Sequence, residues 1–331
     1  MTSPLDVLEA LCHRYAFGDV RALVPMLGLP ADAVARLRRI CLFGQRLVDM
    51  DAEDFDMADT ADGGPEYTAL VDRARACRMP QRPDERYRGA LGSLAPSFRL
   101  MLEVLAARHF RHDMAGFVST VHIMGEYLPL LIWEGAWGHA GDPARIGADV
   151  ARPDSRFGTG DDECAHHRPD ASAASRALRI ARSDVRGWQT YLDRYHSNLS
   201  HAVAVCAGAC VNPCSVMVDL DQPTRAHVSE ANALALAFGD SSLIKLRHSA
   251  PVGHGFGVPS PEEVEKTWQH TREVLAKRSP MGESALTDDG YCLPGLVSFL
   301  STLTNVALTP DTLLRDTAAL TVDKLYAAWD R

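Results

Sequence analysis

Apolar residues recur every three or four positions over most of this chain, which is the spacing of helices with one buried face. The segments that carry this spacing are residues 6–15, 30–50, 66–78, 91–110, 113–137, 184–210, 230–238, 261–277, 295–307 and 309–329. No internal repeat and no alternation of strands with helices is visible in the sequence. The pattern predicts an all-α fold, with residues 1–331 forming a single large helical domain that contains long irregular connecting loops.

The expected loops are rich in glycine, proline and acidic residues and lack a sustained apolar period. They cover residues 49–65, 138–175, 249–261 and 278–294. One short strand is expected over residues 215–220. Thr309 is expected to cap the last helix, because Pro310 follows it in the position that opens many helices.

The segment from residue 184 to 210 is expected to form one long helix, with Ser183 as its N-cap. At about 100° per residue, His196 falls within an apolar stripe of this helix, whereas His201 lies on the polar side. The stripe consists of Leu192, Leu199, Val203 and Cys210. A single imidazole in an apolar wall can bind a flat, metal-bearing cofactor. The alternative is a core histidine that is satisfied by a hydrogen bond.

Composition and charge exclude some classes of partner. The net charge is −9, and clustered lysine and arginine for phosphate binding are missing, so no nucleic acid is expected. No uninterrupted apolar run reaches the length of a membrane span, and the first residues do not resemble a secretion signal. We therefore expect no membrane partner and a cytoplasmic location.

Eight cysteines are scattered along the chain, and in a cytoplasmic protein they are expected to be reduced. Cys206, Cys210 and Cys214 stand four residues apart, which is not a zinc-ribbon or ferredoxin spacing. Tight helix packing and a metal cluster are the two interpretations of this series.

Several histidines stand beside carboxylates and could take part in chemistry. His122 and Glu126 are four residues apart on one expected helix and could share a metal. A di-iron carboxylate site would also need E-x-x-H pairs on helices, and the candidates are Glu163 with His166 and, as an aspartate variant, Asp193 with His196. The His112-Asp113 pair is a weak sign of a phosphohydrolase. Residues 253–257, GHGFG, are typical of either a lid over a pocket or a surface loop.

An all-α chain with a lone helix-borne histidine and a downstream glycine-rich loop resembles the heme-dependent aromatic oxygenases of the tryptophan 2,3-dioxygenase superfamily. One relative in that group attaches its heme through an H-x-x-x-C motif. The matching segment here runs from His196 to Ser200, with serine in place of the cysteine. The resemblance therefore implies a non-covalent heme b, as in the bacterial tyrosine hydroxylases of antibiotic biosynthesis.

The resemblance implies that the chain hydroxylates a phenolic amino acid, converting L-tyrosine to L-DOPA with hydrogen peroxide or oxygen. His196 would be the iron ligand, and Trp188 and Leu199 would complete the cofactor-binding residues. An arginine fork suits the substrate carboxylate, and a histidine suits the phenol. The candidate residues are Arg111 and His122 for substrate binding, and His109, His112 and His254 for catalysis. A homodimer is an open possibility. The alternatives are a non-heme iron oxygenase with His122 and Glu126, and a helical binding protein without catalysis.

Overall fold

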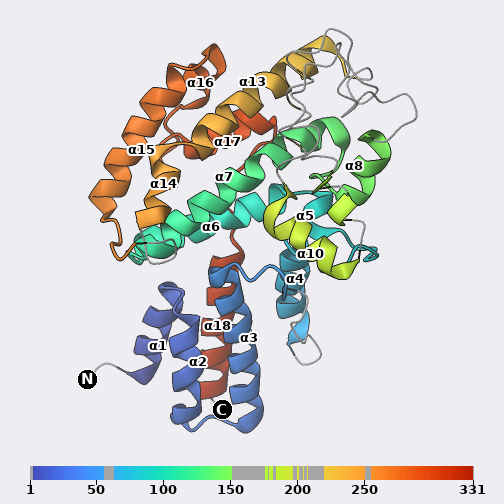
Figure 1. Cartoon of the computed structure of the whole chain (residues 1–331). Coiled ribbons are helices and arrows are strands. Elements are labelled where there is room, and N and C mark those ends of the chain that lie inside the picture. Colours follow the sequence, from blue (N-terminus) through green and yellow to red (C-terminus); the bar gives the residue numbers. More distant parts are fainter. Residues whose placement is uncertain are drawn as a thin grey trace. The chain divides into compact units, whose positions relative to one another are not determined.

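A computed structural model describes residues 3–55, 63–150, 176–177, 179–181, 184–196, 200, 204, 207, 220–249 and 255–330. The elements within these ranges are helices, and no strand occurs among them, which confirms the all-α prediction (Figure 1). Contacts between Cα atoms divide the chain into two compact units. The first unit contains Met1–Met79, Pro96–Asp113 and Thr309–Arg331, and the second contains Pro80–Ala95 and Met114–Leu308. The single domain stays a prediction.

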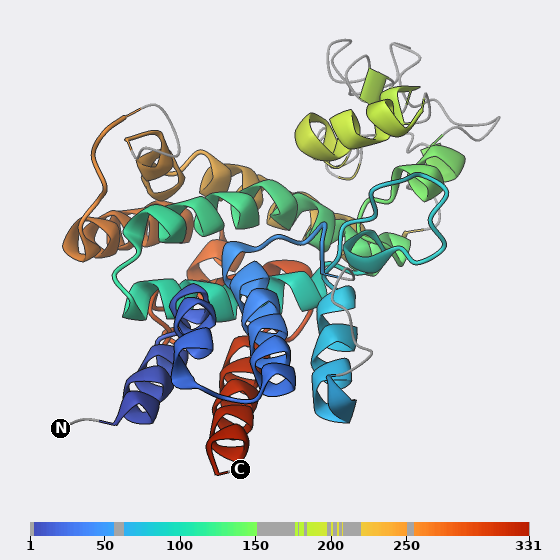
Figure 2. The same cartoon turned by 90° about the horizontal axis from the view of Figure 1, so that it is seen from below.

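The first unit is a bundle built from both ends of the chain. Its helices are α1 (Pro4–His13), α2 (Phe17–Leu23), the 3-10 turn η1 (Val24–Leu27), α3 (Ala31–Asp49), α4 (Gly64–Arg75), most of α6 (Ala95–Phe110) and α18 (Leu313–Trp329). The C-terminal α18 packs against α1, α3 and α4, so it lies among the N-terminal helices (Figures 1 and 2).

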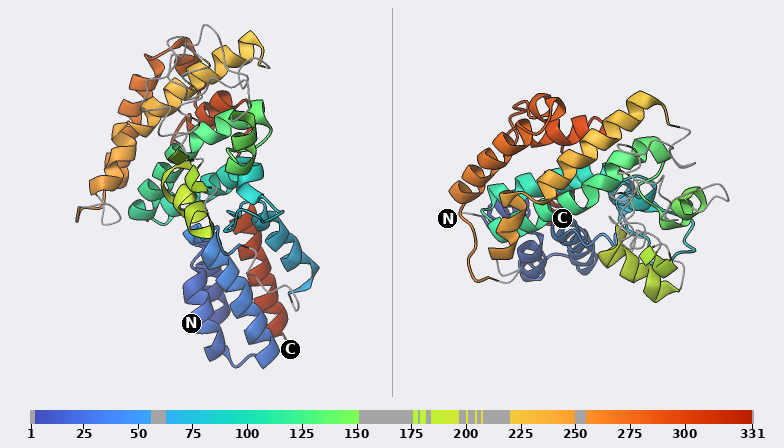
Figure 3. Two further views of the ribbon diagram at one scale, coloured as in Figure 1. Left: turned by 45° about the vertical axis from the view of Figure 1, so that its right-hand side comes forward. Right: turned by 45° about the horizontal axis from the view of Figure 1, so that its top comes forward.

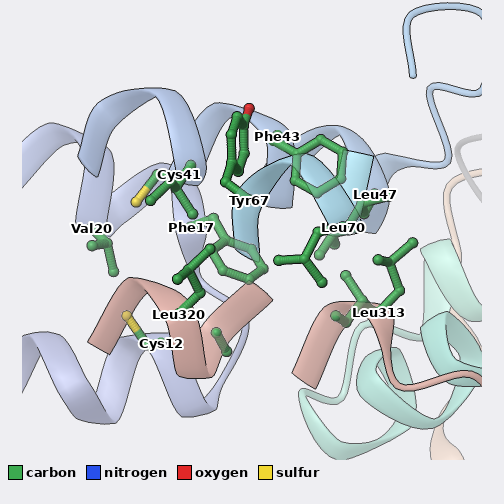
Figure 4. Close-up of a cluster of buried hydrophobic side chains, with 14 of the residues drawn as sticks. Cys12, Phe17, Val20, Cys41, Phe43, Leu47, Tyr67, Leu70, Leu313 and Leu320 are labelled. Atoms are coloured by element: carbon green, nitrogen blue, oxygen red, sulfur yellow. The ribbon is translucent and has the colours of Figure 1, made fainter. Parts of the chain in front are cut away.

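Aromatic and aliphatic side chains from α1, α2, α3, α4, α6 and α18 fill the core of the first unit, part of which Figure 4 shows. Phe43 and Tyr67 meet edge to face, with ring centroids 5.6 Å apart. Phe17 is fully buried against α3, where Gly44 leaves room for its ring. Burial raises the pKa of the Cys12 thiol to about 12, so this buried cysteine stays protonated and acts as a small apolar side chain.

The close approach of Phe17 to Gly44 makes this glycine a test of core packing. A Cβ atom at position 44 would stand 2.7 Å from the Phe17 ring. Gly44→Ala should therefore lower the free energy of unfolding, because overpacking costs about 1–3 kcal/mol and exceeds the gain in helix propensity of about 0.5–1 kcal/mol. Gly135→Ala is the control, because an added Cβ at this exposed helical position meets nothing within 4 Å. Gly135→Ala should raise the free energy of unfolding measured by urea titration. If Gly44→Ala and Gly135→Ala change this free energy equally, the packing argument is wrong.

The start of α18 differs from the prediction. The helix begins at Leu313 rather than after Thr309, and Thr312 at its N-cap position makes no side-chain cap. Instead, Glu103 of α6 accepts hydrogen bonds from the backbone N–H groups of Leu314 (2.9 Å) and Arg315 (3.0 Å). The cap was missed because it comes from a residue more than 200 positions away in sequence, which local pattern cannot detect.

The second unit is organised around α7 (Met114–Trp137), which packs against three later helices. Its other elements are α5 (Gly89–Gly92), α8 (Pro143–Val150), α10 (Val185–Arg194), α13 (Gln222–Gly239), α14 (Ser242–Ser249), α15 (Pro261–Ala276), α16 (Pro280–Ala285) and α17 (Leu296–Thr304). The helices α13, α14 and α17 contact α7, and α15 contacts α13 and α14 (Figure 3).

Among the described helices, α7 alone has the length and apolar composition needed to cross a bilayer. The sequence of α7 contains no uninterrupted apolar run of this length, because Glu126 and Glu134 interrupt it. Of its most apolar stretch, 61% is buried inside the structure, as in the core helix of a soluble protein.

Several elements depart from the sequence-based boundaries. The expected loop over residues 138–175 contains α8, and the loop over residues 278–294 contains α16. The helix α13 begins at Gln222 rather than residue 230, because Asp221 caps it by accepting from the N–H of Thr224. The helix α14 was not predicted at all. Of the expected strand over residues 215–220, residues 215–219 lie outside the described residues.

The prediction of one long helix from residue 184 to 210 is wrong. The helix α10 ends at Arg194, and the backbone of Tyr195 leaves the helical region with φ −124° and ψ −1°. Asp184, rather than Ser183, is the N-cap, and its carboxylate accepts from the N–H of Gly187. Apolar periodicity continued through Tyr195, so the interruption left no mark in the pattern.

Candidate functional site

Two aromatic side chains fix α10 within the second unit. The Trp188 indole donates to the carbonyl of Pro80 at 2.8 Å, and the Arg88 guanidinium lies 4.9 Å from its ring centroid. The Tyr191 hydroxyl donates to the carbonyl of Gly141 at 3.2 Å. Trp188 was predicted to bind a cofactor, and the structure shows it buried and hydrogen-bonded in the packing of the unit.

His196 follows directly after this anchored helix and is only 6% exposed. Its ring stacks on Tyr127 of α7, with centroids 4.2 Å apart and planes inclined by 13°. Among the described residues, neither ring nitrogen has a hydrogen-bond partner. Burial lowers the pKa of His196, because it disfavours the charged ring. The carboxylate of Glu126 and the carbonyl of Leu192 act in the opposite direction, although that carbonyl does not meet hydrogen-bond geometry with either nitrogen.

A second histidine of α7 lies between a carboxylate and a guanidinium. The Nε2 atom of His122 is 3.0 Å from Oε1 of Glu126 and 2.7 Å from Nη1 of Arg247 in α14. One nitrogen cannot donate to the carboxylate and accept from the guanidinium at the same time. The hydrogen bond from His122 lowers the pKa of Glu126, and the positive charge of Arg247 adds to this effect. Glu126 is therefore ionised at neutral pH.

His122 and Glu126 border a cavity of about 240 Å³ between α7, α13 and α14. It is lined by His122, Gly125, Glu126, Ala235, Leu236, Gly239, Asp240 and Ile244. The structure thus groups His122 and Glu126, as the sequence predicted, and adds Asp240 from the end of α13. Electrostatic coupling between Glu126 and His196 links this cavity to the buried imidazole.

Three predicted site residues belong to the first unit and end α6. His112 has φ 58°, and the N–H groups of His112 and Asp113 donate to the carbonyls of His109 and Arg108 at 3.0 and 2.9 Å. This pattern is a Schellman motif with His112 in the left-handed position. The Arg111 guanidinium donates to the carbonyl of Tyr15 at 3.3 Å. His109, Arg111 and His112 thus take part in ending a helix, and their predicted roles in catalysis and substrate binding stay predictions.

Some predictions fall on residues outside the described ranges. These residues are Leu199, His254, Glu163, His166, His201, Cys164, Cys206, Cys210 and Cys214. Within the described ranges, no group of three or more histidine, cysteine, aspartate or glutamate side chains is arranged to hold a metal ion. The described cysteines, Cys12, Cys41, Cys77 and Cys292, form no disulfide, and the reduced state of the cysteines stays a prediction.

The sequence did not single out Tyr127, Arg247 or Asp240, although each lies beside a predicted site residue. Tyr127 directly follows Glu126 and could have been found by its position. Arg247 lies in α14, which was not predicted, and Asp240 lies just before this helix, so no sequence signal placed them near α7. In comparisons with known proteins, no family model, no curated protein and no solved structure matches this chain.

Proposed function

We propose that this protein is a heme-dependent oxidoreductase that uses His196 as its iron ligand and hydroxylates a phenolic amino acid in the cytoplasm, in natural-product biosynthesis. The observation that carries the proposal is the buried His196 ring, whose two nitrogens have no partner within the described part of the chain. A buried polar atom without a hydrogen bond costs about 1–3 kcal/mol. Such an atom therefore indicates that a partner is missing.

The donor atom suits heme iron. Burial lowers the pKa of His196, so the ring is neutral at pH 7 and keeps a lone pair for a metal. Tyr127 covers one face of the ring and fixes its plane, and neither ring nitrogen has a hydrogen-bond partner among the described residues. Heme with a histidine ligand supplies the oxidising chemistry of peroxide- and oxygen-dependent enzymes.

The next residues of this segment support a non-covalent cofactor. Ser200 stands where the related motif has cysteine, and it is fully buried. Its carbonyl accepts a hydrogen bond from the Trp133 indole at 3.1 Å. This bond connects Ser200 to α7, which also carries Tyr127.

The experiment is an absorption spectrum of the full chain, expressed with iron and a heme precursor. We expect an intense Soret band that His196→Ala removes, and heme that acid and organic solvent extract. The matched control is His227→Ala, because His227 contacts the carbonyl of Leu303 at 3.0 Å and has no part in the site. His254→Ala is tested in parallel. An unchanged spectrum in His196→Ala, or loss only in His254→Ala, would refute His196 as the ligand.

The same preparation tests the reaction. A site that binds the phenol pairs its hydroxyl, so phenylalanine would leave a buried polar group unsatisfied. We expect a catechol product from L-tyrosine and peroxide, and little or none from L-phenylalanine. Equal turnover of both amino acids would contradict the tyrosine assignment while leaving the cofactor assignment intact.

A further inference from the structure

The cavity beside α7 has an apolar floor and an acidic rim. Gly125, Ala235 and Ile244 form the floor, and a Cβ atom at Gly125 would already stand 3.1 Å from the Ile244 side chain. An added Cβ at Gly239 would meet nothing within 4 Å, so this part of the lining borders open space. The volume of about 240 Å³ is below the range of about 300–1,000 Å³ for drug-sized ligands. The cavity therefore suits a molecule with a single ring.

The charges at the rim favour a cation. Glu126 from α7 and Asp240 from the end of α13 both line the cavity, and Glu126 is ionised at neutral pH. The neighbouring positive group is the guanidinium of Arg247, whose Nη1 atom lies 2.7 Å from Nε2 of His122, but Arg247 is not among the residues that line the cavity. The carboxylates of Glu126 and Asp240 would repel a carboxylate on the ligand, whereas they would attract a ligand's ammonium group.

We propose that this cavity binds a small primary amine with a compact aromatic body, whose ammonium group pairs with Glu126 and Asp240 while its ring lies on the Gly125 and Ala235 floor. The proposal does not rest on the proposed heme function. It prefers an amine over the corresponding amino acid, because the amino acid adds a carboxylate that the rim repels. Tyramine therefore binds more tightly than tyrosine.

Calorimetric titration of the full chain with tyramine tests the proposal. We expect saturable binding at one site, weakened about tenfold or more by Glu126→Gln and by Asp240→Asn, because each change removes a charge-assisted contact. Both changes keep the size of the side chain, and Glu126→Gln keeps an acceptor for His122. Glu265→Gln is the matched control, since it removes one exposed negative charge from α15 outside the cavity.

Two further ligands make the test specific. Para-hydroxyphenethyl alcohol has the shape of tyramine without its charge, and tyrosine adds the carboxylate. We expect neither to compete at concentrations that saturate with tyramine, and we expect Gly239→Leu to reduce tyramine binding by filling the open side of the lining. Equal affinity for the alcohol, or tyramine binding unchanged in both carboxylate variants, would overturn the assignment. Thermal melts of the variants confirm that each is folded.

Discussion

Replacing Asp142 by alanine is expected to lower the free energy of unfolding of the second unit by about 3–5 kcal/mol, because it leaves a guanidinium without its partner. Asp142 is 2% exposed and accepts from Nε and Nη2 of Arg88 at 2.7 and 2.8 Å. It also accepts from the N–H of Ala144 at 3.0 Å and so caps α8. Arg88 in turn lies over the ring of Trp188. One carboxylate therefore connects α8, the segment before α5, and α10.

Urea titration of single and double variants measures how much the Arg88–Asp142 ion pair contributes to the free energy of unfolding. Arg82→Ala is the control, because its contact with Asp84 at 3.3 Å is exposed on both sides and should be worth less than about 1 kcal/mol. Adding Arg88→Met to Asp142→Ala should restore part of the loss, since the uncompensated charge is then gone. If Asp142→Ala lowers the free energy of unfolding no more than Arg82→Ala does, the bidentate pair does not stabilise the second unit.

The sequence could predict the features whose signals are local, but not the contacts between distant residues. The helices α3, α7 and α15 were predicted to within about two residues, because their amphipathic period and end signals are local. The Ser260 capping box at the start of α15 is an example. By contrast, Asp142 lies in a segment expected to be a loop. Its importance comes from Arg88, which is 54 positions away.

The candidate site shows the same limit. His122 and Glu126 could be paired from their spacing on one helix. The prediction for His196 assumed a continuous helix, which ends at Arg194, yet the side chain is buried as expected. Its neighbour Tyr127 comes from α7, and the stacking of two rings from distant helices leaves no periodic mark in the sequence. Apolar spacing therefore predicted which side chains are buried, but not which residues they meet.

In the first unit, Glu103→Ala is expected to lower the free energy of unfolding by about 2–4 kcal/mol, because two backbone donors of α18 lose their acceptors. Glu103 is 7% exposed, so water does not readily replace the carboxylate. The measurement is urea unfolding at pH 7. The control is Glu66→Ala, since Glu66 is exposed and pairs with Lys324 at 2.8 Å. Its removal should cost less than about 1 kcal/mol.

Burial also gives Glu103 a defined effect on the pH dependence of stability. Burial raises its pKa above the ordinary value of 4.5, and the nearby carboxylates of Asp311 and Asp316 add to this, while the hydrogen bonds from Leu314 and Arg315 oppose it. The folded state therefore holds this proton more tightly than the unfolded state. The contribution of Glu103 is most favourable below pH 4.5 and decreases as the pH rises through the folded pKa.

Glu103→Gln removes this titration while keeping the shape of the side chain, so it isolates the pH effect. From pH 4.5 to 7, the wild-type free energy of unfolding should fall relative to that of Glu103→Gln, since only the wild type must ionise a buried carboxyl group. Glu66→Gln, which removes an exposed carboxylate, is measured over the same pH range as the control. If the wild-type free energy of unfolding rises relative to that of Glu103→Gln over this range, the hydrogen bonds from the two backbone N–H groups lower the pKa of Glu103 by more than burial raises it. The pKa of Glu103 would then lie below its ordinary value.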